Sequence, residues 1–258
     1  MITIDRDKCI GCGKCVSVCP FTVLNMSEGK ANLTDKYCLE CMHCSIVCPV
    51  DAIKFNGEEA REEEVKALSE NCAEVVEQII RQRRSYRIFS DNKVKRETID
   101  HIMKIAKLVP SAKNTHPTNG IIIDEDEKRN ELMSIIEEFI RENNVSPEII
   151  EELEKDNNPV VGINSSLLIG YCKNDSLDPV HDTAIALTSI ELMMQARIIG
   201  TFWGGYLMRY LNNIPKCREF IGLPDDCSVY GTLMFGYPKQ ANYDYIPKRF
   251  LNSETRYL

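Results

Sequence analysis

The sequence contains little that would suit a membrane span or a nucleic-acid partner. No apolar run approaches the roughly 20 residues that a membrane-spanning helix needs. The first residues, MITIDRDKCIGCGK, carry charges where a secretory signal peptide needs its apolar core. Basic residues are outnumbered, because 31 Lys and Arg stand against 39 Asp and Glu, and the net charge is −8. A nucleic-acid binder needs a basic surface to neutralise phosphates. We therefore expect a cytoplasmic protein that binds neither membrane nor nucleic acid.

The usual nucleotide-binding motifs are also missing. There is no G-x-x-x-x-G-K-[ST] loop, and the one glycine-rich candidate, GCGKCV at 11–16, lacks a third glycine and lies among cysteines. A Rossmann site and a P-loop are thereby excluded. No Cys–His or Ser–His–Asp arrangement suggests a nucleophile, so we predict no catalytic side chain. With 258 residues the chain is long enough for one large domain or two modest ones.

Cysteine, by contrast, is abundant, and eight of the 12 cysteines form two similar runs, CIGCGKCVSVCP at 9–20 and CLECMHCSIVCP at 38–49. The spacing C-x2-C-x2-C-x3-C-P is typical of bacterial ferredoxins with two clusters, in which the fourth cysteine of each run binds the other cluster. It predicts two 4Fe-4S clusters, one held by Cys9, Cys12, Cys15 and Cys48, the other by Cys38, Cys41, Cys44 and Cys19. Structural zinc is the alternative, but zinc needs only four ligands in two pairs. We interpret the four scattered cysteines as packing residues: Cys72, Cys172, Cys217 and Cys227.

The surroundings of the two runs fit a small iron–sulfur domain. Gly11 and Gly13 suit a loop whose backbone curls close to inorganic sulfur. Apolar and polar residues alternate in the segment between the runs, and the segment turns at SEGK, as a hairpin does. AIKF after Pro49 is typical of a closing strand. Residues 1–57 resemble the two-cluster ferredoxin family over their full length. We place a linker with the start of a helix at 58–74 and a second domain at 75–258.

The second domain mixes helical and strand patterns, which indicates an α+β fold. The apolar residues between Val65 and Ile80 recur at helical spacing. Further helices are predicted at 97–109, 126–143, 146–156 and 178–200, the last ending at Gly200, and strands at 120–124, 166–172 and 226–238. The helix containing AIALTSIELMMQA is apolar nearly all round, so we expect it inside a domain or at a dimer interface.

Four stretches of this domain stand out, although each has an ordinary explanation when taken alone. RQRRSYR at 81–87 is either a solvated helix end or an anion cradle built from arginine forks and a serine. VPSAKNTHPTNG at 109–120 could be turn chemistry only. GTFWGGY at 200–206 could be a bulge. The basic pair in GYPKQANYDYIPKRF at 236–250 could be plain surface.

Taken together and in this order, the four stretches resemble the FMN-dependent nitroreductase family. The family motif R-x-S-x-[RK] corresponds to Arg83, Ser85 and Arg87, and P-S-x-x-N-x-Q-P-W corresponds to PSAKNTHPT. An apolar helix follows, then a G-T-x-W-x-G-[GF] loop, and finally G-Y-P with a basic pair. The resemblance covers about residues 75–258, and the combination is much more specific than any one motif.

The resemblance implies a fold, a cofactor and site residues. The fold would have a central, mostly antiparallel sheet flanked by helices, in an interlocked homodimer with FMN at the interface. The FMN phosphate and ribityl chain would be held by Arg83, Arg84, Ser85, Arg87, Lys248 and Arg249. The flavin ring would be lined by Pro110, Ser111 and Asn114 of the partner subunit and by the backbone at Gly204 and Gly205. His116 replaces the usual Gln and Thr118 the usual Trp, which leaves the substrate open.

The two domains together predict an iron–sulfur flavoprotein oxidoreductase. Clusters move single electrons and flavin converts between one-electron and two-electron chemistry. Electrons from ferredoxin, flavodoxin or NAD(P)H would pass through the two clusters to FMN and then to a nitroaromatic, a quinone or a similar electron-poor acceptor. The alternatives are a relay protein without a dedicated substrate, an NAD(P)H-dependent enzyme that exports electrons through the clusters, and an oxygen-using flavin enzyme.

Overall fold

The computed structural model describes residues 2–61, 63–240, 245–246, 248 and 254–257. The chain divides into two compact units: unit 1 comprises residues 1–69 with 113–115, and unit 2 comprises residues 70–112 and 116–258. Each unit has its own buried apolar core.

Unit 1 is built from short antiparallel strands and two single-turn helices. Its first sheet has the order β1-β4-β5, from β1 (Ile2–Ile4), β4 (Ile53–Phe55) and β5 (Glu58–Glu59). The predicted hairpin is confirmed as β2 (Leu24–Ser27) and β3 (Lys30–Leu33). The helices α1 (Lys14–Ser17) and α2 (His43–Ile46) each carry the third cysteine of one run. These elements place both cysteine runs around one small core.

The loop of the first cysteine run requires glycine at residue 11. Gly11 has φ +71°, and a Cβ there would lie 2.1 Å from the carbonyl oxygen of Gly29 in the hairpin turn. A side chain is thus excluded both by backbone conformation and by contact. The hairpin turn therefore fixes the path of the cysteine loop.

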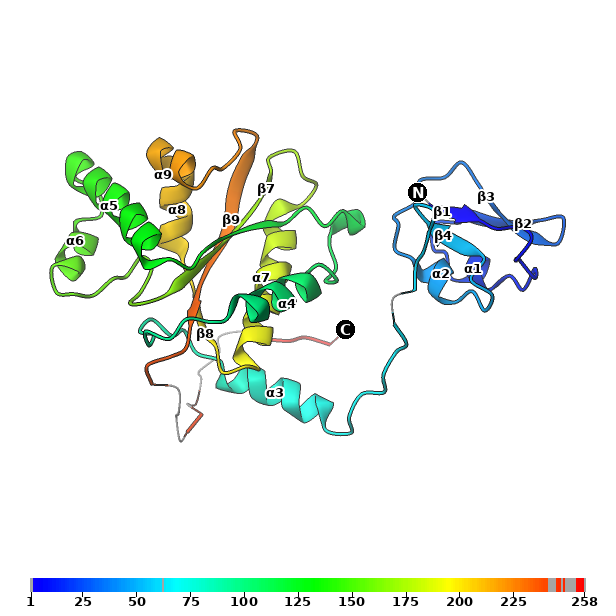
Figure 1. The fold of residues 1–258 in the computed structure, drawn as a ribbon, viewed down its shortest axis with the longest axis horizontal. Helices are drawn as coiled ribbons and strands as arrows, with labels where there is room; N and C mark the ends of the chain where they lie inside the picture. The colour runs from blue at the N-terminus through cyan, green and yellow to red at the C-terminus, as the bar shows by residue number, and fades with distance from the viewer. Residues whose placement is uncertain (1, 62, 241–244, 247, 249–253, 258) are drawn as a thin grey trace. The chain divides into compact units, whose positions relative to one another are not determined.

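Unit 2 has a four-stranded antiparallel sheet covered by helices on both faces (Figure 1). The strand order is β6-β7-β9-β8, from β6 (Asn119–Ile123), β7 (Ser166–Lys173), β9 (Cys227–Gly236) and β8 (Gly200–Trp203). Alternate residues of β7 enter different cores, because Leu167 and Ile169 pack on one side and Leu168 on the other. The predicted antiparallel sheet between helices is confirmed.

The helices form two layers around this sheet. One core contains residues of α4 (Arg96–Ala106) and α7 (Pro179–Gln195). The other contains residues of α5 (Asp126–Asn143), α6 (Pro147–Leu153), α8 (Gly205–Asn213) and α9 (Pro215–Phe220). Helix α3 (Cys72–Gln82) packs against α7. Cys172, Cys217 and Cys227 are buried, as expected of packing residues, and Cys72 is half-buried. No helix within the described residues is long and apolar enough to cross a membrane.

The end of the long helix differs from the prediction. α7 ends at Gln195 instead of Gly200, and Gly200 opens strand β8. Ile198 adopts φ +59°, and the N–H of Ile199 donates to the carbonyl of Met194. Glycine or asparagine usually occupies such a left-handed position, so an isoleucine there leaves no signal in the sequence.

Candidate functional site

The first void in unit 1 is lined by four cysteines. Cys9, Cys12, Cys15 and Cys48 line it together with apolar side chains such as Ile53. Three of these cysteines come from the first run and the fourth from the second run. This is the set that the spacing predicts for one cluster.

The second void has the complementary composition. Cys38, Cys41 and Cys44 line it with Cys19 of the first run. The walls are otherwise apolar, with Phe21 among them. Within the described residues no three Cys, His, Asp or Glu side chains converge closely enough for a single metal ion. Each void instead brings together the four thiols that the spacing predicts for one four-iron cluster.

The sulfur atoms lie in an environment that suits thiolate ligands of a cationic centre. Backbone N–H groups donate to three of them: Ala31 to Cys9 Sγ at 3.5 Å, Glu40 to Cys38 Sγ at 3.3 Å and Ala52 to Cys48 Sγ at 3.3 Å. Such bonds are the usual outer-shell contacts of cluster sulfurs.

Burial changes the acidity of two of the cluster thiols. It raises the pKa of Cys44 to about 11, and it raises the pKa of Cys15 as well. Both thiols would be neutral at pH 7 unless a metal centre displaces the proton. The grouping of four thiols in each void, with N–H groups directed at three of the sulfurs, fits two iron–sulfur clusters.

The predicted arginine segment in unit 2 runs beside the predicted glycine loop. The N–H of Tyr86 donates to the carbonyl of Thr201 at 3.0 Å, and Ser85 forms a parallel bridge with Thr201. Because α3 ends at Gln82 and β8 ends at Trp203, this pairing brings the two motifs together although more than a hundred positions separate them. Ser85 itself is exposed.

A pocket of about 630 Å³ lies where these motifs meet. Among the predicted residues, Arg87, Gly204 and Gly205 line it. The guanidinium of Arg87 lies 5.4 Å from the ring centre of Phe202, a cation–π contact. Trp203 and Tyr206 of the GTFWGGY motif also line it. The structure adds four lining residues that no local pattern in the sequence marks: Glu152, Asn157, Pro159 and Arg209.

The two glycines of this pocket have different surroundings. The N–H of Gly204 donates to the carbonyl of Thr232 at 3.0 Å, so it is used within the fold. Gly205 begins helix α8, and the first N–H groups of a helix have no acceptor within it. A Cβ on Gly205 would meet nothing within 4 Å. The backbone at Gly205 is therefore the accessible part of this loop.

Arg83 and Arg84 use their guanidinium groups differently. Arg83 forms an ion pair with Glu191 at 3.1 Å, an acidic residue that sequence reasoning missed. The sequence does contain a signal for Glu191, because it is a single charged residue inside the apolar helix AIALTSIELMMQA. A buried charge needs a partner, so a basic residue was to be expected beside it. Arg84 donates to the carbonyls of Arg81 at 2.8 Å and Arg83 at 2.7 Å, which is typical of a cation at a helix C-terminus. Its predicted contact with a cofactor stays a prediction.

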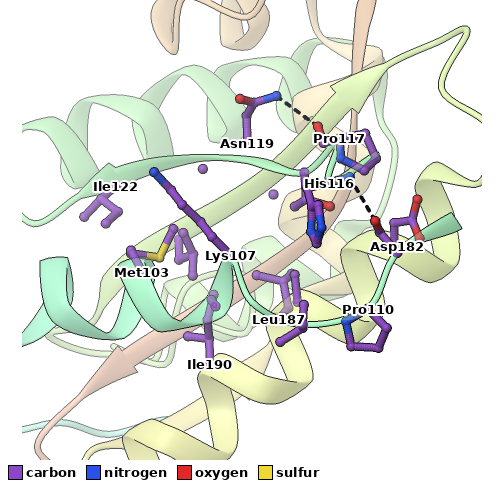
Figure 2. Close-up of a pocket in the computed structure, with 18 residues that line it drawn as sticks. Met103, Lys107, Pro110, His116, Pro117, Asn119, Ile122, Asp182, Leu187 and Ile190 are labelled. Carbon is purple, nitrogen blue, oxygen red and sulfur yellow. Dashed lines mark hydrogen bonds between the residues drawn. The ribbon is translucent and has the colours of Figure 1, made fainter. Parts of the chain in front are cut away.

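The PSAKNTHPT motif lines a different pocket of the same unit, with a volume of about 390 Å³. Figure 2 shows Pro110 and His116 at this pocket, together with the apolar side chains of Met103, Leu187 and Ile190 that also line it. Ser111, Pro117 and Thr118 line it too, whereas Asn114 is not one of its lining residues. Asp182 of α7 accepts a hydrogen bond from the N–H of Ala112 at 2.7 Å, and the N–H of His116 donates to Ser111 Oγ at 2.9 Å. The first bond ties the motif to α7, and the second closes a turn within the motif.

The predicted basic pair can be placed only in part. Lys248 is exposed. Arg249 lies outside the described residues. Their predicted role in holding a phosphate stays a prediction.

Comparison with known proteins supplies the family of each part of the chain. The model of the nitroreductase family matches residues 80–237, and that of a 4Fe-4S dicluster domain matches residues 2–55. A protein of Archaeoglobus fulgidus, named as an NADH dehydrogenase or NAD(P)H nitroreductase, is 27% identical over 181 residues, which is 68% of this chain and 88% of that protein. A ferredoxin of Pyrobaculum islandicum is 41% identical over 66 residues, which is 25% of this chain and 62% of the ferredoxin.

Solved structures agree on the fold of unit 2. A nitroreductase of Bacteroides fragilis with bound FMN has a TM-score of 0.61 at 18% identity and covers 70% of this chain and 97% of that one. A nitroreductase of Desulfitobacterium hafniense with bound FMN has a TM-score of 0.57 at 16% identity, over 69% and 98%. The predicted cofactor types are thus confirmed for the matched families. The chain belongs to the nitroreductase family of oxidoreductases and carries a 4Fe-4S dicluster domain ahead of its nitroreductase domain.

Proposed function

We propose that the chain binds FMN in unit 2 and two 4Fe-4S clusters in unit 1, and that it reduces a small electron-poor acceptor with electrons from a low-potential donor. Nitroaromatics and quinones are the proposed acceptors, and ferredoxin, flavodoxin or NAD(P)H the proposed donors. The observation that carries this proposal is the presence, in one chain, of two four-cysteine voids and a pocket lined by Arg87 and Gly205. When bound, the clusters would exchange single electrons and FMN would exchange electrons singly or in pairs.

The chain's own groups would bind and orient the flavin. Arg83 and Arg87 offer guanidinium forks to the phosphate and the ribityl chain, since several of their N–H groups remain after their contacts with Glu191 and Phe202. Helix α8 presents its N-terminal N–H groups beside Gly205, where they can donate to ring oxygens or nitrogens. Lys248 and Arg249 would complete the phosphate end.

A homodimer is the proposed assembly. Pro110 and Ser111 line a different pocket from the one that contains Arg87 and Gly205. One chain therefore offers two separate parts of a flavin site. In a symmetric dimer the partner's PSAKNTHPT motif would complete the site of the first subunit. We keep a cytoplasmic location as part of this proposal.

The cofactor content is the first test. Protein purified without oxygen should contain about eight irons and eight sulfides per chain, from two four-iron clusters, and about one FMN. Zinc in place of iron, or a protein that refuses flavin, would contradict the proposal. Size measurement in solution tests the dimer on the same sample.

Two substitutions should separate the two cofactor sites. Cys12→Ala should lose one cluster and keep FMN, because Cys12 lines only the first void. Arg83→Ala should weaken FMN binding and spare both clusters. Arg81→Ala is the matched control, since Arg81 is an exposed arginine only two residues earlier, in the last turn of α3. An Arg83→Ala protein that binds FMN as tightly as the parent would show that the arginine cradle is wrongly assigned.

Turnover decides between an enzyme and the alternatives. With chemically reduced ferredoxin as donor, steady consumption of a nitroaromatic or a quinone supports the reductase. Flavin reduction without consumption of any acceptor would favour an electron-transfer relay. Oxidation of NAD(P)H coupled to reduction of added ferredoxin would favour an enzyme that exports electrons.

A further inference from the structure

The buried carboxylate of Glu191 joins three elements around the proposed flavin pocket. Its side chain projects from α7, and the residue is 4% exposed. Oε1 accepts from the guanidinium of Arg83 at 3.1 Å and from the hydroxyl of Thr201 at 3.2 Å. Oε2 accepts from the indole N–H of Trp203 at 3.1 Å. Both oxygens are thus used, by donors from the segment after α3 and from β8.

The ion pair with Glu191 holds the Arg83 guanidinium on its buried side. The Glu191 side chain is 6% exposed and the Arg83 side chain 27% exposed, so the carboxylate approaches from the core and part of the guanidinium faces solvent. Within the described residues the Arg83 side chain has no other hydrogen bond or ion pair. A guanidinium has five N–H donors in one plane, and fixing one edge fixes the direction of the others.

Glu191 also holds the residue that precedes the glycine loop. Trp203 lines the same pocket as Gly204 and Gly205, and the residue is 40% exposed. The hydrogen bond from its indole nitrogen to Glu191 fixes the rotation of the ring at the pocket wall. One carboxylate therefore fixes the orientation of two side chains. They are Arg83, the predicted phosphate-binding arginine, and Trp203, which forms the pocket wall beside the predicted ring-binding loop.

We propose that Glu191 is a positioning residue of the flavin site, which orients Arg83 toward the FMN phosphate and Trp203 against the flavin ring. This inference rests on the proposed function. If Glu191 acted only through its charge, the effect on FMN affinity would be the opposite. Removal of a negative charge beside the phosphate site would then make FMN bind more tightly. The two explanations therefore predict opposite effects of Glu191→Gln on FMN affinity.

Two variants separate orientation from charge. Glu191→Gln removes the charge and places an amide NH₂ among three donors, so at least one of them loses its acceptor. Glu191→Asp keeps the charge but is one methylene shorter, so it cannot hold all three donors in place. If Glu191 orients Arg83 and Trp203, both variants should bind FMN more weakly than the parent. Glu97→Gln, an exposed acidic residue on α4, is the control for a change of net charge.

The flavin-free full-length protein gives a readout that does not depend on the cofactor. Trp203 is the only tryptophan of the chain, so intrinsic tryptophan emission reports on this site alone. Both Glu191 variants should shift the emission to longer wavelength and increase quenching by acrylamide, because the indole loses its buried acceptor. Glu97→Gln should change neither. An unchanged emission spectrum in both Glu191 variants would overturn the inference.

Binding of FMN and of riboflavin then tests the phosphate end. Titration of the full-length protein should show FMN affinity reduced about fivefold or more in both Glu191 variants, with a smaller loss for riboflavin, which lacks the phosphate. Equal or tighter FMN binding in Glu191→Asp and Glu191→Gln would overturn the inference and leave the proposed function intact. A parent protein that binds neither flavin would overturn both. If Glu191→Gln does not fold, Glu191→Asp alone decides.

Discussion

Adjacent glycines at the entrance of helix α8 should respond to the same substitution in opposite ways. Gly204→Ala should destabilise unit 2. The backbone of Gly204 is acceptable to alanine, with φ −104°. A Cβ there would, however, lie 2.2 Å from Met234 Cε and 2.7 Å from Thr232 Oγ1. Thr232 cannot turn away without losing its 2.7 Å hydrogen bond to the carbonyl of Gly204. Gly205→Ala should be tolerated, because its Cβ would meet nothing within 4 Å.

The magnitudes follow from packing and helix propensity. Overpacking of a filled site costs about 1–3 kcal/mol, so we expect that loss in the free energy of unfolding for Gly204→Ala. Alanine is preferred over glycine in a helix by up to about 1 kcal/mol, so Gly205→Ala should leave the free energy of unfolding unchanged or slightly increase it. Its added methyl group, however, enters the proposed flavin pocket, and we expect FMN to bind about tenfold more weakly, which is about 1.4 kcal/mol.

Two measurements on the full-length chain test this pair. Urea unfolding, followed by circular dichroism and by the emission of the single tryptophan, gives the stability of unit 2. Titration with FMN gives the affinity. The reasoning fails if Gly205→Ala unfolds at lower urea concentration than Gly204→Ala, or if Gly205→Ala binds FMN as the parent does.

Three further predictions concern other parts of the chain. Cys48→Ser should lose the cluster of the first run and keep about four irons, whereas Cys72→Ser, at a half-buried cysteine outside both voids, should keep both clusters in an iron count. The Asp178 carboxylate raises the pKa of His181 at the start of α7, so an NMR titration should place that pKa above the ordinary value, and Asp178→Asn should bring it down. Because the folded-state pKa of His181 is raised and that of Asp178 is lowered, this pair stabilises the fold fully between about pH 4 and about pH 6.5, and the contribution disappears as the pH rises through the folded-state pKa of His181. Arg129 is buried and donates to the carbonyl of Ser165 at 2.9 Å; Arg129→Ala should therefore lower the free energy of unfolding by about 1–3 kcal/mol, as urea unfolding would measure.

The elements that the sequence predicted are those with a regular period or a clear turn signal. The hairpin in unit 1 carries Glu-Gly at its turn, and helix α5 follows its predicted bounds because its apolar residues recur at helical spacing. Strand β8 and helices α8 and α9 were not predicted. Glycines at 204 and 205 indicated a loop, whereas the structure uses them as the cap and the first residue of α8.

The candidate sites were predictable to the extent that short motifs determine them. Cysteine spacing alone groups the thiols as the two voids do, because each run is local and only its fourth cysteine crosses over. The motif segments in unit 2 were identified individually. Their partners were not: Glu191, although it is a lone charge in an apolar helix, meets Arg83 only through the tertiary packing of α7, and Arg209 reaches the pocket from α8.

The exchange of a cysteine between the two runs of unit 1 has a consequence for biogenesis. If the voids hold clusters as proposed, the first nascent cysteine run cannot complete its own set of four thiolates, because Cys48 is synthesised dozens of residues after Cys15. Iron insertion would then have to wait until the ribosome has released both runs. Cluster assembly would then require the whole small domain. A chain arrested between the two runs would contain no complete set of four cysteine ligands for a cluster.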